Sequence, residues 1–240
     1  AQCPHFLKYI SDFRDGDHVD IAVFQQVLGM SITGTTKERL FFVLYGRGSN
    51  GKGILFKVLE NILGHYHIGI SEYALRKKTD IPKQLVKLVG KRIATIAEMN
   101  EGSQQDEALL KSFVAGDTMT YKSLYKEELS FIPQCKLWFS TNVITELKYS
   151  DAMKERLLVI PCTRQFKGDD IDISLFDKLI KEREGILAWL VQGSVLWYQA
   201  TKEGRSIRDI IPESWKESTE NYWFECDPIR KWILSNCDQK

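Results

Sequence analysis

One short loop constrains this chain more than any other feature of its sequence. It reads Gly46-Arg47-Gly48-Ser49-Asn50-Gly51-Lys52-Gly53. The continuous apolar run Leu40 to Tyr45 precedes it, and a segment with helical periodicity follows from Ile54. A continuous apolar run is typical of a strand buried on both faces of a parallel sheet. The order of strand, glycine-rich loop and helix therefore predicts a P-loop, whose backbone N–H groups surround phosphate oxygens.

The chemistry expected of such a loop is the binding of ATP. The lysine of a P-loop reaches the β- and γ-phosphates, and a Ser or Thr directly after it holds Mg²⁺. Here Lys52 is present, but Gly53 replaces the hydroxyl residue. The sequence thus predicts an intact phosphate site with a weakened metal site, in which all eight residues from Gly46 to Gly53 contact the nucleotide.

An acidic residue follows the next apolar run, at 92–97. Glu98 could orient or deprotonate the attacking water if it lies near the γ-phosphate. The position before it, where many P-loop ATPases have a metal-binding Asp, is Ala97. With ligands missing at both Gly53 and Ala97, two interpretations are open. Either Mg²⁺ is held mainly by phosphate oxygens and water, with Glu98 behind that water, or hydrolysis has been lost; we favour the first.

Strands alternate with helices along the rest of the core, which predicts an α/β fold with a parallel central sheet. We expect further strands at 92–97, 135–140 and 157–161, helices at 54–63, 79–90 and 108–114, and a β-hairpin between Thr118 and Pro133. A small helical lead-in should precede the core. A helix from Leu175 to about Ala200 should follow it, and then helical stretches at 207–215 and 228–237. We expect three units, at 1–37, 38–166 and 167–240.

The composition limits the class of protein without indicating its partner. A chain of 240 residues has room for one sizeable core, and its net charge of +1 carries no global signal for nucleic acid. Its apolar runs are far shorter than the roughly 20 residues that span a bilayer. The five cysteines (Cys3, Cys135, Cys162, Cys226 and Cys237) have no metal-binding spacing. We therefore expect reduced thiols, a cytoplasmic location, no membrane segment and a fragment of a longer protein.

Three later segments make the pattern specific to one family. They are Ser112–Thr118 with the hairpin after it, Lys136–Asn142 and Asp151–Arg156. In this order, behind the P-loop and Glu98, they resemble the primase-helicase family of phages, plasmids and poxviruses. Members of that family are superfamily 3 helicases with an AAA+-like core. The resemblance runs from about Phe41 to Phe166, and the tail from Ile211 to Ile229 resembles the family's C-terminal extension.

The resemblance implies catalytic roles for residues at matching positions. Asn142 would be the polar sensor that hydrogen-bonds the γ-phosphate or the attacking water. Arg156 would be the arginine finger that enters a neighbouring subunit's site, and Arg164 is the alternative, because both arginines flank the same strand. A finger acting in trans requires a closed ring, and rings of this family are typically hexamers.

The resemblance also implies a DNA-binding hairpin. The segment between Thr118 and Pro133 would project into the channel of the ring, with Lys126 at its tip and Lys122 on its approach. Six copies would concentrate positive charge that a single chain lacks, and Tyr125 could stack on a base. The alternative for this segment is a solvated turn with ordinary charges.

Together these expectations describe an ATP-dependent DNA helicase motor of phage, plasmid or viral replication in the host cytoplasm. Its partners would be Mg²⁺, ATP, single-stranded or forked DNA, further copies of the chain, and a primase or polymerase domain of the same full-length protein. The missing ligands at Gly53 and Ala97 motivate one alternative, a hydrolysis-poor, nucleotide-dependent DNA clamp or initiator scaffold. A third possibility, an AAA+ machine acting on protein, is disfavoured by the lysine at the hairpin tip.

Overall fold

The computed structural model describes residues 2–75, 85–97, 99, 105–121, 129–143, 147, 150–227 and 236. The α-helices are α1 (Pro4–Phe13), α2 (His18–Ser31), α3 (Lys52–Leu63), α5 (Glu107–Ala115), α6 (Asp151–Lys154), α7 (Leu175–Lys181), α8 (Arg183–Lys202), α9 (Ile207–Ile210) and α10 (Glu213–Glu225). The strands are β1 (Phe41–Tyr45), β2 (His67–Gly69), β3 (Ile93–Ile96), β4 (Met119–Tyr121), β5 (Leu129–Phe131), β6 (Lys136–Thr141) and β7 (Leu157–Pro161). Short 3-10 turns follow α3 and precede β3.

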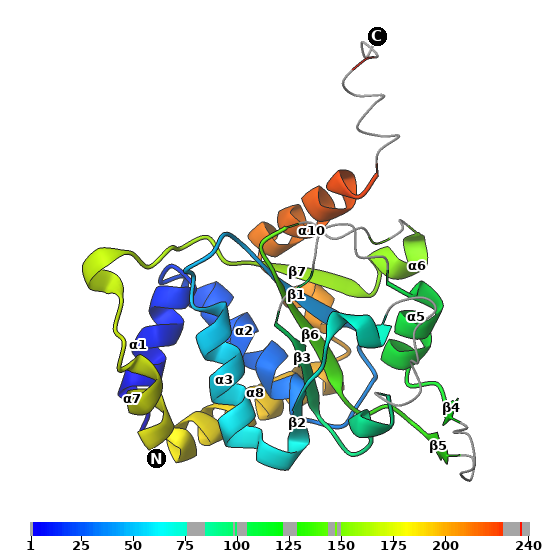
Figure 1. The fold of residues 1–240 in the computed structure, drawn as a ribbon, viewed down its shortest axis with the longest axis horizontal. Helices are drawn as coiled ribbons and strands as arrows, with labels where there is room; N and C mark the ends of the chain where they lie inside the picture. Colours follow the sequence, from blue (N-terminus) through cyan, green and yellow to red (C-terminus); the bar gives the residue numbers. More distant parts are fainter. Residues whose placement is uncertain are drawn as a thin grey trace.

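Five strands form a parallel sheet in the order β2-β3-β6-β1-β7, which confirms the predicted α/β fold (Figure 1). β1 lies between β6 and β7, so that Tyr45 is in register with both Thr141 and Pro161. The carboxyl ends of these three strands therefore meet at one edge of the sheet. Ligands of open α/β sheets bind at such an edge, where neighbouring connections leave in opposite directions.

Successive residues of each central strand point to opposite faces, and both faces are buried. Phe42, Leu44 and Trp138 belong to a core shared with α1, α2, α3 and α8. Phe41, Val43 and Phe139 belong to a second core, shared with α5, α6 and the end of α10. This burial on both faces explains why the strands read as continuous apolar runs in the sequence.

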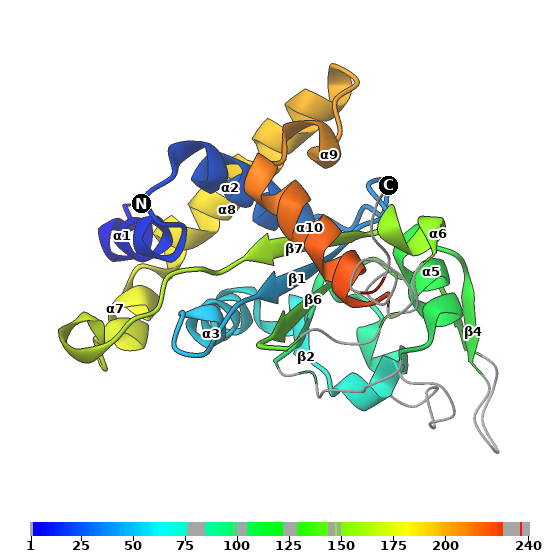
Figure 2. The same ribbon diagram turned by 90° about the horizontal axis from the view of Figure 1, so that it is seen from above.

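The N-terminal helix α2 and the later helix α8 pack against each other (Figure 2). α2 crosses α8 where Gly29 faces Gly193. A Cβ at Gly29 would lie 2.2 Å from the backbone N of Ser194, and one at Gly193 would lie 2.1 Å from the carbonyl of Gln25. The two glycines thus allow the helix backbones to approach closely, and the lead-in and the C-terminal region share one core.

The edge strand β7 is covered by α10 (Figure 1). The hydroxyl of Thr219 accepts a hydrogen bond from the backbone N–H of Val159 at 3.0 Å. An edge strand otherwise exposes such donors to other chains, so α10 protects the sheet at this side. Among the described residues, no helix is both long and apolar enough to cross a membrane.

Three details differ from the sequence-based expectation. β2 was not predicted, because a strand of three residues carries too little periodicity. The expected helix from Leu175 to Ala200 is broken at Glu182, whose carboxylate accepts hydrogen bonds from the backbone N–H groups of His5 and Phe6. The stretch 207–215 is likewise interrupted, because a residue before proline avoids the helical region, and Ile211 before Pro212 is extended.

Two other predicted segments fall wholly or partly outside the described residues. The helix predicted at 79–90 is described only from residue 85, where Val86–Leu88 form a 3-10 turn. The helical stretch predicted at 228–237 lies outside, apart from residue 236. The predicted hairpin is confirmed in its two strands, since β4 and β5 pair antiparallel from Met119 opposite Phe131.

Candidate functional site

The P-loop connects β1 to α3 at the carboxyl edge of the sheet. Its turn requires left-handed backbone at Ser49, with φ of 60°, and at Gly51, with φ of 85°. Gly46 must lack a side chain, because a Cβ there would lie 2.1 Å from the carbonyl of Cys162. Asn50 is buried and donates to that same carbonyl at 3.3 Å, which fastens the loop to the end of β7.

Lys52 begins α3, and its side chain turns back under the loop. Its ammonium donates to the carbonyl of Gly46 at 2.5 Å and to the carbonyl of Thr141 at 3.2 Å. It also donates to Oδ1 of Asn142 at 2.8 Å. Only 5% of the residue is exposed, and burial lowers its pKa, an effect that the neighbouring Cys162 partly opposes. The hydrogen bonds of Lys52 therefore hold its ammonium at the place where the sequence predicts phosphate.

Asn142 lies directly after β6, the strand next to β1. Asn142 is exposed beside the loop. The residue before it, Thr141, donates a hydrogen bond from its hydroxyl to the carbonyl of Val143 at 2.6 Å. The structure thus brings Lys52 and Asn142, which are 90 positions apart in the sequence, into direct contact. This geometry suits an amide that contacts the terminal phosphate or a water beside it.

A cavity of about 870 Å³ extends from the P-loop along the ends of β2, β3 and β6. Its far wall includes His67 and Thr95, whose side chains lie 3.0 Å apart. Burial lowers the pKa of His67, and the carboxylate of Glu60 partly opposes that shift. Sequence reasoning assigned no role to His67, because His65 and His67 have no third metal ligand near them in the sequence.

The described lining of this cavity is poor in carboxylate ligands for a metal ion. Mg²⁺ prefers oxygen ligands and uses one or two carboxylates at most nucleotide sites. Gly53 has no hydroxyl and Ala97 has no carboxylate; among the described lining residues, Glu60 is the one acid. A Cβ at Gly53 would meet nothing within 4 Å, so the space for a hydroxyl side chain exists there.

The two candidate arginines lie at opposite ends of β7. Arg156 precedes the strand, its backbone carbonyl accepts from the N–H of Phe41, and its Nη1 donates to the carbonyl of Ala152 at 2.5 Å. Five residues of strand separate it from the P-loop edge, roughly 16 Å at 3.3 Å per residue. Arg156 is therefore too far from the loop of its own chain to contact a phosphate there.

Arg164 lies beside the P-loop of its own chain. The next two residues run along that loop: Gln165 donates to the carbonyl of Gly48 at 3.4 Å, and the N–H of Phe166 donates to the carbonyl of Ser49 at 2.7 Å. The guanidinium of Arg164 lies 5.3 Å from the centre of the Phe166 ring. The sequence treated both arginines as candidates for one role, but their positions support different ones.

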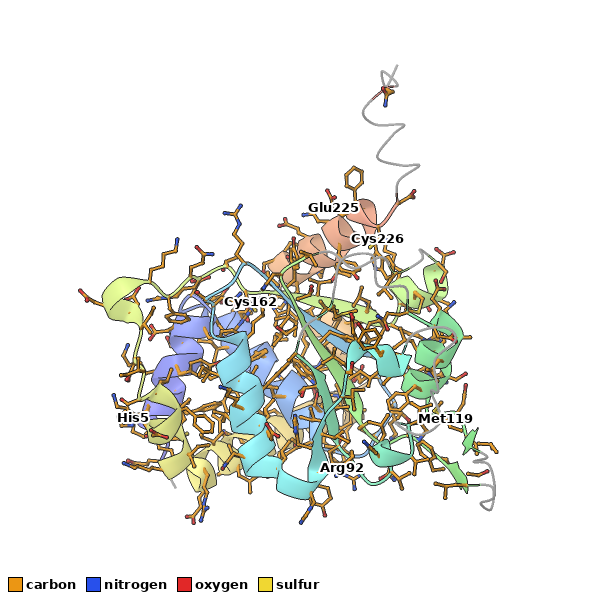
Figure 3. The ribbon with its side chains drawn as sticks, in the orientation of Figure 1. His5, Arg92, Met119, Cys162, Glu225 and Cys226 are labelled. Atoms are coloured by element: carbon orange, nitrogen blue, oxygen red, sulfur yellow. The ribbon has the colours of Figure 1, made fainter. Side chains whose placement is uncertain are left out.

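Four predicted site residues lie outside the described part of the chain, namely Glu98, Lys122, Tyr125 and Lys126. The strands that flank the last three, β4 and β5, lie at the opposite end of the molecule from α1 (Figure 1). Figure 3 labels Met119 at the start of β4 and His5 on α1, and shows this separation.

Two viral proteins and one family model match this sequence. A family of unknown function, DUF5906, matches residues 44–156. The protein named Putative helicase L207/L206 of Acanthamoeba polyphaga mimivirus is 27% identical over 229 residues, which are 86% of this chain and 23% of that protein. Putative helicase 184R of Invertebrate iridescent virus 6 is 25% identical over 220 residues, 79% of this chain and 23% of that protein. The chain thus spans about a quarter of the length of these relatives.

Solved structures with the same fold include those of the NrS-1 C-terminal region. Its A-form apo structure matches with a TM-score of 0.67 at 14% identity, and a second apo structure matches with a TM-score of 0.65 at 16% identity. Each match covers 100% of this chain and 60% of the other. At this level of identity the likeness establishes the fold alone.

Proposed function

We propose that this chain is the ATP-hydrolysing motor of a DNA helicase that acts in viral or phage replication. The observation that carries the proposal is the cluster of Lys52, Gly46 and Asn142 at the switch point of the parallel sheet. The names of the two viral relatives, Putative helicase L207/L206 and Putative helicase 184R, support the same activity. The resemblance to superfamily 3 helicases belongs to this proposal as well.

The residues of the cluster would act on the terminal phosphates of ATP. The backbone N–H groups of the loop and the Lys52 ammonium bind the β- and γ-phosphates and stabilise the charge that develops on transfer. Asn142 positions the γ-phosphate or the attacking water. Glu98 accepts a proton from that water as its oxygen attacks phosphorus and the bond to the β-phosphate oxygen breaks.

The metal would be held differently from the usual P-loop pattern. Mg²⁺ supplies neutralisation of the charge on the β- and γ-phosphate oxygens when it is bound. With no side-chain ligand at Gly53 or Ala97, this chain would leave Mg²⁺ to phosphate oxygens and water. Glu98 would then hold one of those waters rather than the metal itself.

The position of Arg156 favours action in trans. Because it lies at the amino end of β7, it can reach a phosphate only across an interface with another copy of the chain. Such head-to-tail interfaces close into rings, and a hexamer is the assembly proposed here. Each site is then completed by its neighbour.

The β4–β5 hairpin would carry the DNA contact. Lys122 and Lys126 bind phosphates without reading the sequence, and Tyr125 stacks on a base. The hairpin follows α5 in the chain. Movement of α5 relative to the core would therefore also move the hairpin. A primase or polymerase domain in the remainder of the full-length protein would complete the replication enzyme.

A strand-separation assay tests this function. Forked DNA with one fluorescent strand is incubated with ATP and Mg²⁺, using wild type, Lys52→Ala and Lys126→Ala. We expect wild type to release the strand and Lys52→Ala to fail, whereas Lys126→Ala should hydrolyse ATP without separating strands. Strand separation by Lys52→Ala at the wild-type rate would contradict the proposal.

One observation favours a second candidate. The absence of ligand atoms at both Gly53 and Ala97 suits a nucleotide-dependent DNA clamp that hydrolyses ATP poorly. Such a clamp would bind DNA more tightly with a non-hydrolysable ATP analogue, yet show no turnover and no strand separation. The same assay with an added anisotropy measurement distinguishes the two.

A further inference from the structure

Three cations gather at the amino edge of the parallel sheet, away from the P-loop. We call them the Arg92 cluster: Lys91 and Arg92 lie directly before β3, and Lys136 begins β6. The backbone N–H of Lys136 donates to the carbonyl of Arg92 at 2.8 Å, so these two residues are neighbours. Figure 3 shows Arg92 well separated from Cys162, which lies at the P-loop edge. The cluster is therefore distinct from the nucleotide site.

Within the described part of the chain, the Arg92 cluster pairs with no carboxylate. Its hydrogen bonds go to neutral oxygens: Lys91 donates to the carbonyl of His65 at 2.7 Å, Arg92 to the amide oxygen of Gln134, and Lys136 to the carbonyl of Gln134 at 3.4 Å. Lys136 is 4% exposed, and this one long bond uses a single N–H donor of its ammonium. Buried charges in proteins are normally paired. The cluster thus lacks a counter-charge.

The like charges of Arg92 and Lys136 make this arrangement costly for the fold. Burial lowers the pKa of Lys136 to about 8, an effect that Cys135 partly opposes and that Arg92 strengthens. An apolar side chain at this position should therefore stabilise the folded chain. Residues that weaken a fold without local compensation are characteristic of functional sites. A bound anion would offset both the burial and the repulsion.

The surroundings of the Arg92 cluster indicate which anion it takes. The hairpin strand β5 ends at Phe131, and Lys136 follows five residues later, a span of at most roughly 18 Å. The exposed ring of Tyr66 lies 5.6 Å from the guanidinium of Arg92. Cations beside an exposed aromatic ring are typical of surfaces that bind single-stranded nucleic acid, where phosphates contact the cations and a base stacks on the ring.

We propose that the Arg92 cluster binds a backbone phosphate of single-stranded DNA beside the root of the hairpin. The phosphate displaces the amide of Gln134 and accepts two parallel hydrogen bonds from the guanidinium of Arg92. Lys136 is too deeply buried for direct contact and attracts the phosphate through an interior of low dielectric constant. The choice of DNA rests on the proposed helicase function, which places its DNA contacts on the hairpin alone. The missing counter-charge among the described residues does not depend on that function.

Fluorescence anisotropy with labelled oligothymidine tests the proposal. The full chain is titrated at several salt concentrations, with a non-hydrolysable ATP analogue in every sample. Arg92→Gln should weaken binding about tenfold at low salt and lower the slope of log affinity against log salt by about 0.7, the value for one phosphate contact to a single strand. Arg183→Gln is the matched control, because Arg183 is an exposed arginine at the start of α8. It should leave both quantities unchanged.

Lys136→Met is the second variant, and it separates binding from folding. It should weaken DNA binding about threefold to tenfold, because the buried charge is lost. The same variant should resist urea better than wild type. A purely structural role for Lys136 would not lower the affinity of a more stable protein. Lys216→Met, on α10, is its control and should change neither quantity.

The outcomes distinguish this site from the proposed function. DNA affinity and salt slope unchanged in both Arg92→Gln and Lys136→Met, with wild type binding DNA, would overturn the Arg92 site and leave the helicase proposal standing. Thermal melting with inorganic phosphate tests a free anion instead. Stabilisation of wild type by phosphate that Arg92→Gln abolishes, with DNA affinity unchanged, would overturn the assignment to DNA. Failure of wild type to bind DNA at all would overturn the proposed helicase function and this ligand with it.

Discussion

The ammonium of Lys52 lies 2.8 Å from Oδ1 of Asn142, so the P-loop and the end of β6 are joined by a direct hydrogen bond. Two carbonyls, of Gly46 and Thr141, share the same ammonium. A phosphate that binds Lys52 must either displace one of these three acceptors from the ammonium or become an additional one. A nucleotide can therefore change the hydrogen bonding of Asn142 through Lys52 as well as by direct contact.

Asn142→Ala tests that relationship. We expect turnover of ATP to fall by roughly 100-fold, because a polar group that positions the reacting phosphate or water is lost. Binding of ATP should weaken far less, since the loop and Lys52 remain. Steady-state kinetics combined with calorimetry separate the two effects, and unchanged turnover would remove Asn142 from the site. Asn142→Asp is a useful companion, because it keeps the acceptor for Lys52 but not the amide donors.

Gly53→Ser should restore the hydroxyl that most P-loops use. The position lies in the first turn of α3, and a Cβ there meets nothing within 4 Å, so the variant should fold. We expect half-maximal turnover at roughly tenfold less Mg²⁺, since the metal gains a protein ligand. Gly53→Ala is the control, because it makes the same change in the backbone without the hydroxyl. Identical Mg²⁺ dependence of the two variants would show that Gly53 does not face the metal.

The two arginines should differ in a mixing experiment. A subunit with Lys52→Ala and one with Arg156→Ala can together form one intact site, if Arg156 acts across the interface. We expect the mixture to recover turnover that neither variant has alone. Mixing Lys52→Ala with Arg164→Ala should recover nothing, because Arg164 lies beside its own P-loop. Recovery in the second mixture and not in the first would reverse the assignment.

Part of this site could be predicted from the sequence. β1, β3, β6 and β7 read as continuous apolar runs because both faces of each are buried. Parallel strands end at the same edge, so residues that follow β1 and β6 were expected to meet there. The contact between Lys52 and Asn142 follows from that logic, whereas the strand order that permits it needed the structure.

Other features depend on contacts that no local pattern encodes. Arg14 is buried and pairs with Asp20 through two hydrogen bonds, and the indole N–H of Trp215 donates to the same carboxylate. The close crossing of α2 and α8 depends on Gly29 and Gly193, which are far apart in the sequence. A cavity of about 680 Å³ likewise lies between residues 5–12 and 164–178. Contacts between residues so far apart in the sequence leave no periodic pattern of apolar residues from which they could be predicted.

Lys136 provides a test of the fold at the other end of the sheet. It begins β6 and is 4% exposed, and its ammonium donates only weakly, to the carbonyl of Gln134 at 3.4 Å. Burial lowers the pKa of Lys136 from 10.5 to about 8, against an opposing effect of Cys135 and with a smaller contribution from Arg92. The charged form is thus disfavoured in the folded state.

The sign of the resulting pH dependence follows directly. Below about pH 8 both folded and unfolded chains carry the charge, so the folded chain bears the full penalty. Between pH 8 and 10.5 the unfolded chain keeps its proton while the folded chain loses it, so the penalty falls steadily and is gone above pH 10.5. Relative to wild type, Lys136→Met should gain about 1 to 3 kcal/mol of unfolding free energy at pH 7, shrinking as pH rises. Urea unfolding at several pH values measures this, with the exposed Lys216→Met as control. A pH-independent difference would contradict the burial argument.

The most direct measurement of the central claim is steady-state ATP turnover with Mg²⁺ at several protein concentrations, with and without single-stranded DNA. Wild type is compared with Glu98→Gln and Lys52→Ala. We predict turnover that rises faster than linearly with protein concentration, increases with DNA and is lost in both variants. Intact ATP binding with no turnover at any concentration, or equal turnover in wild type and Glu98→Gln, would contradict the account of a ring-forming motor.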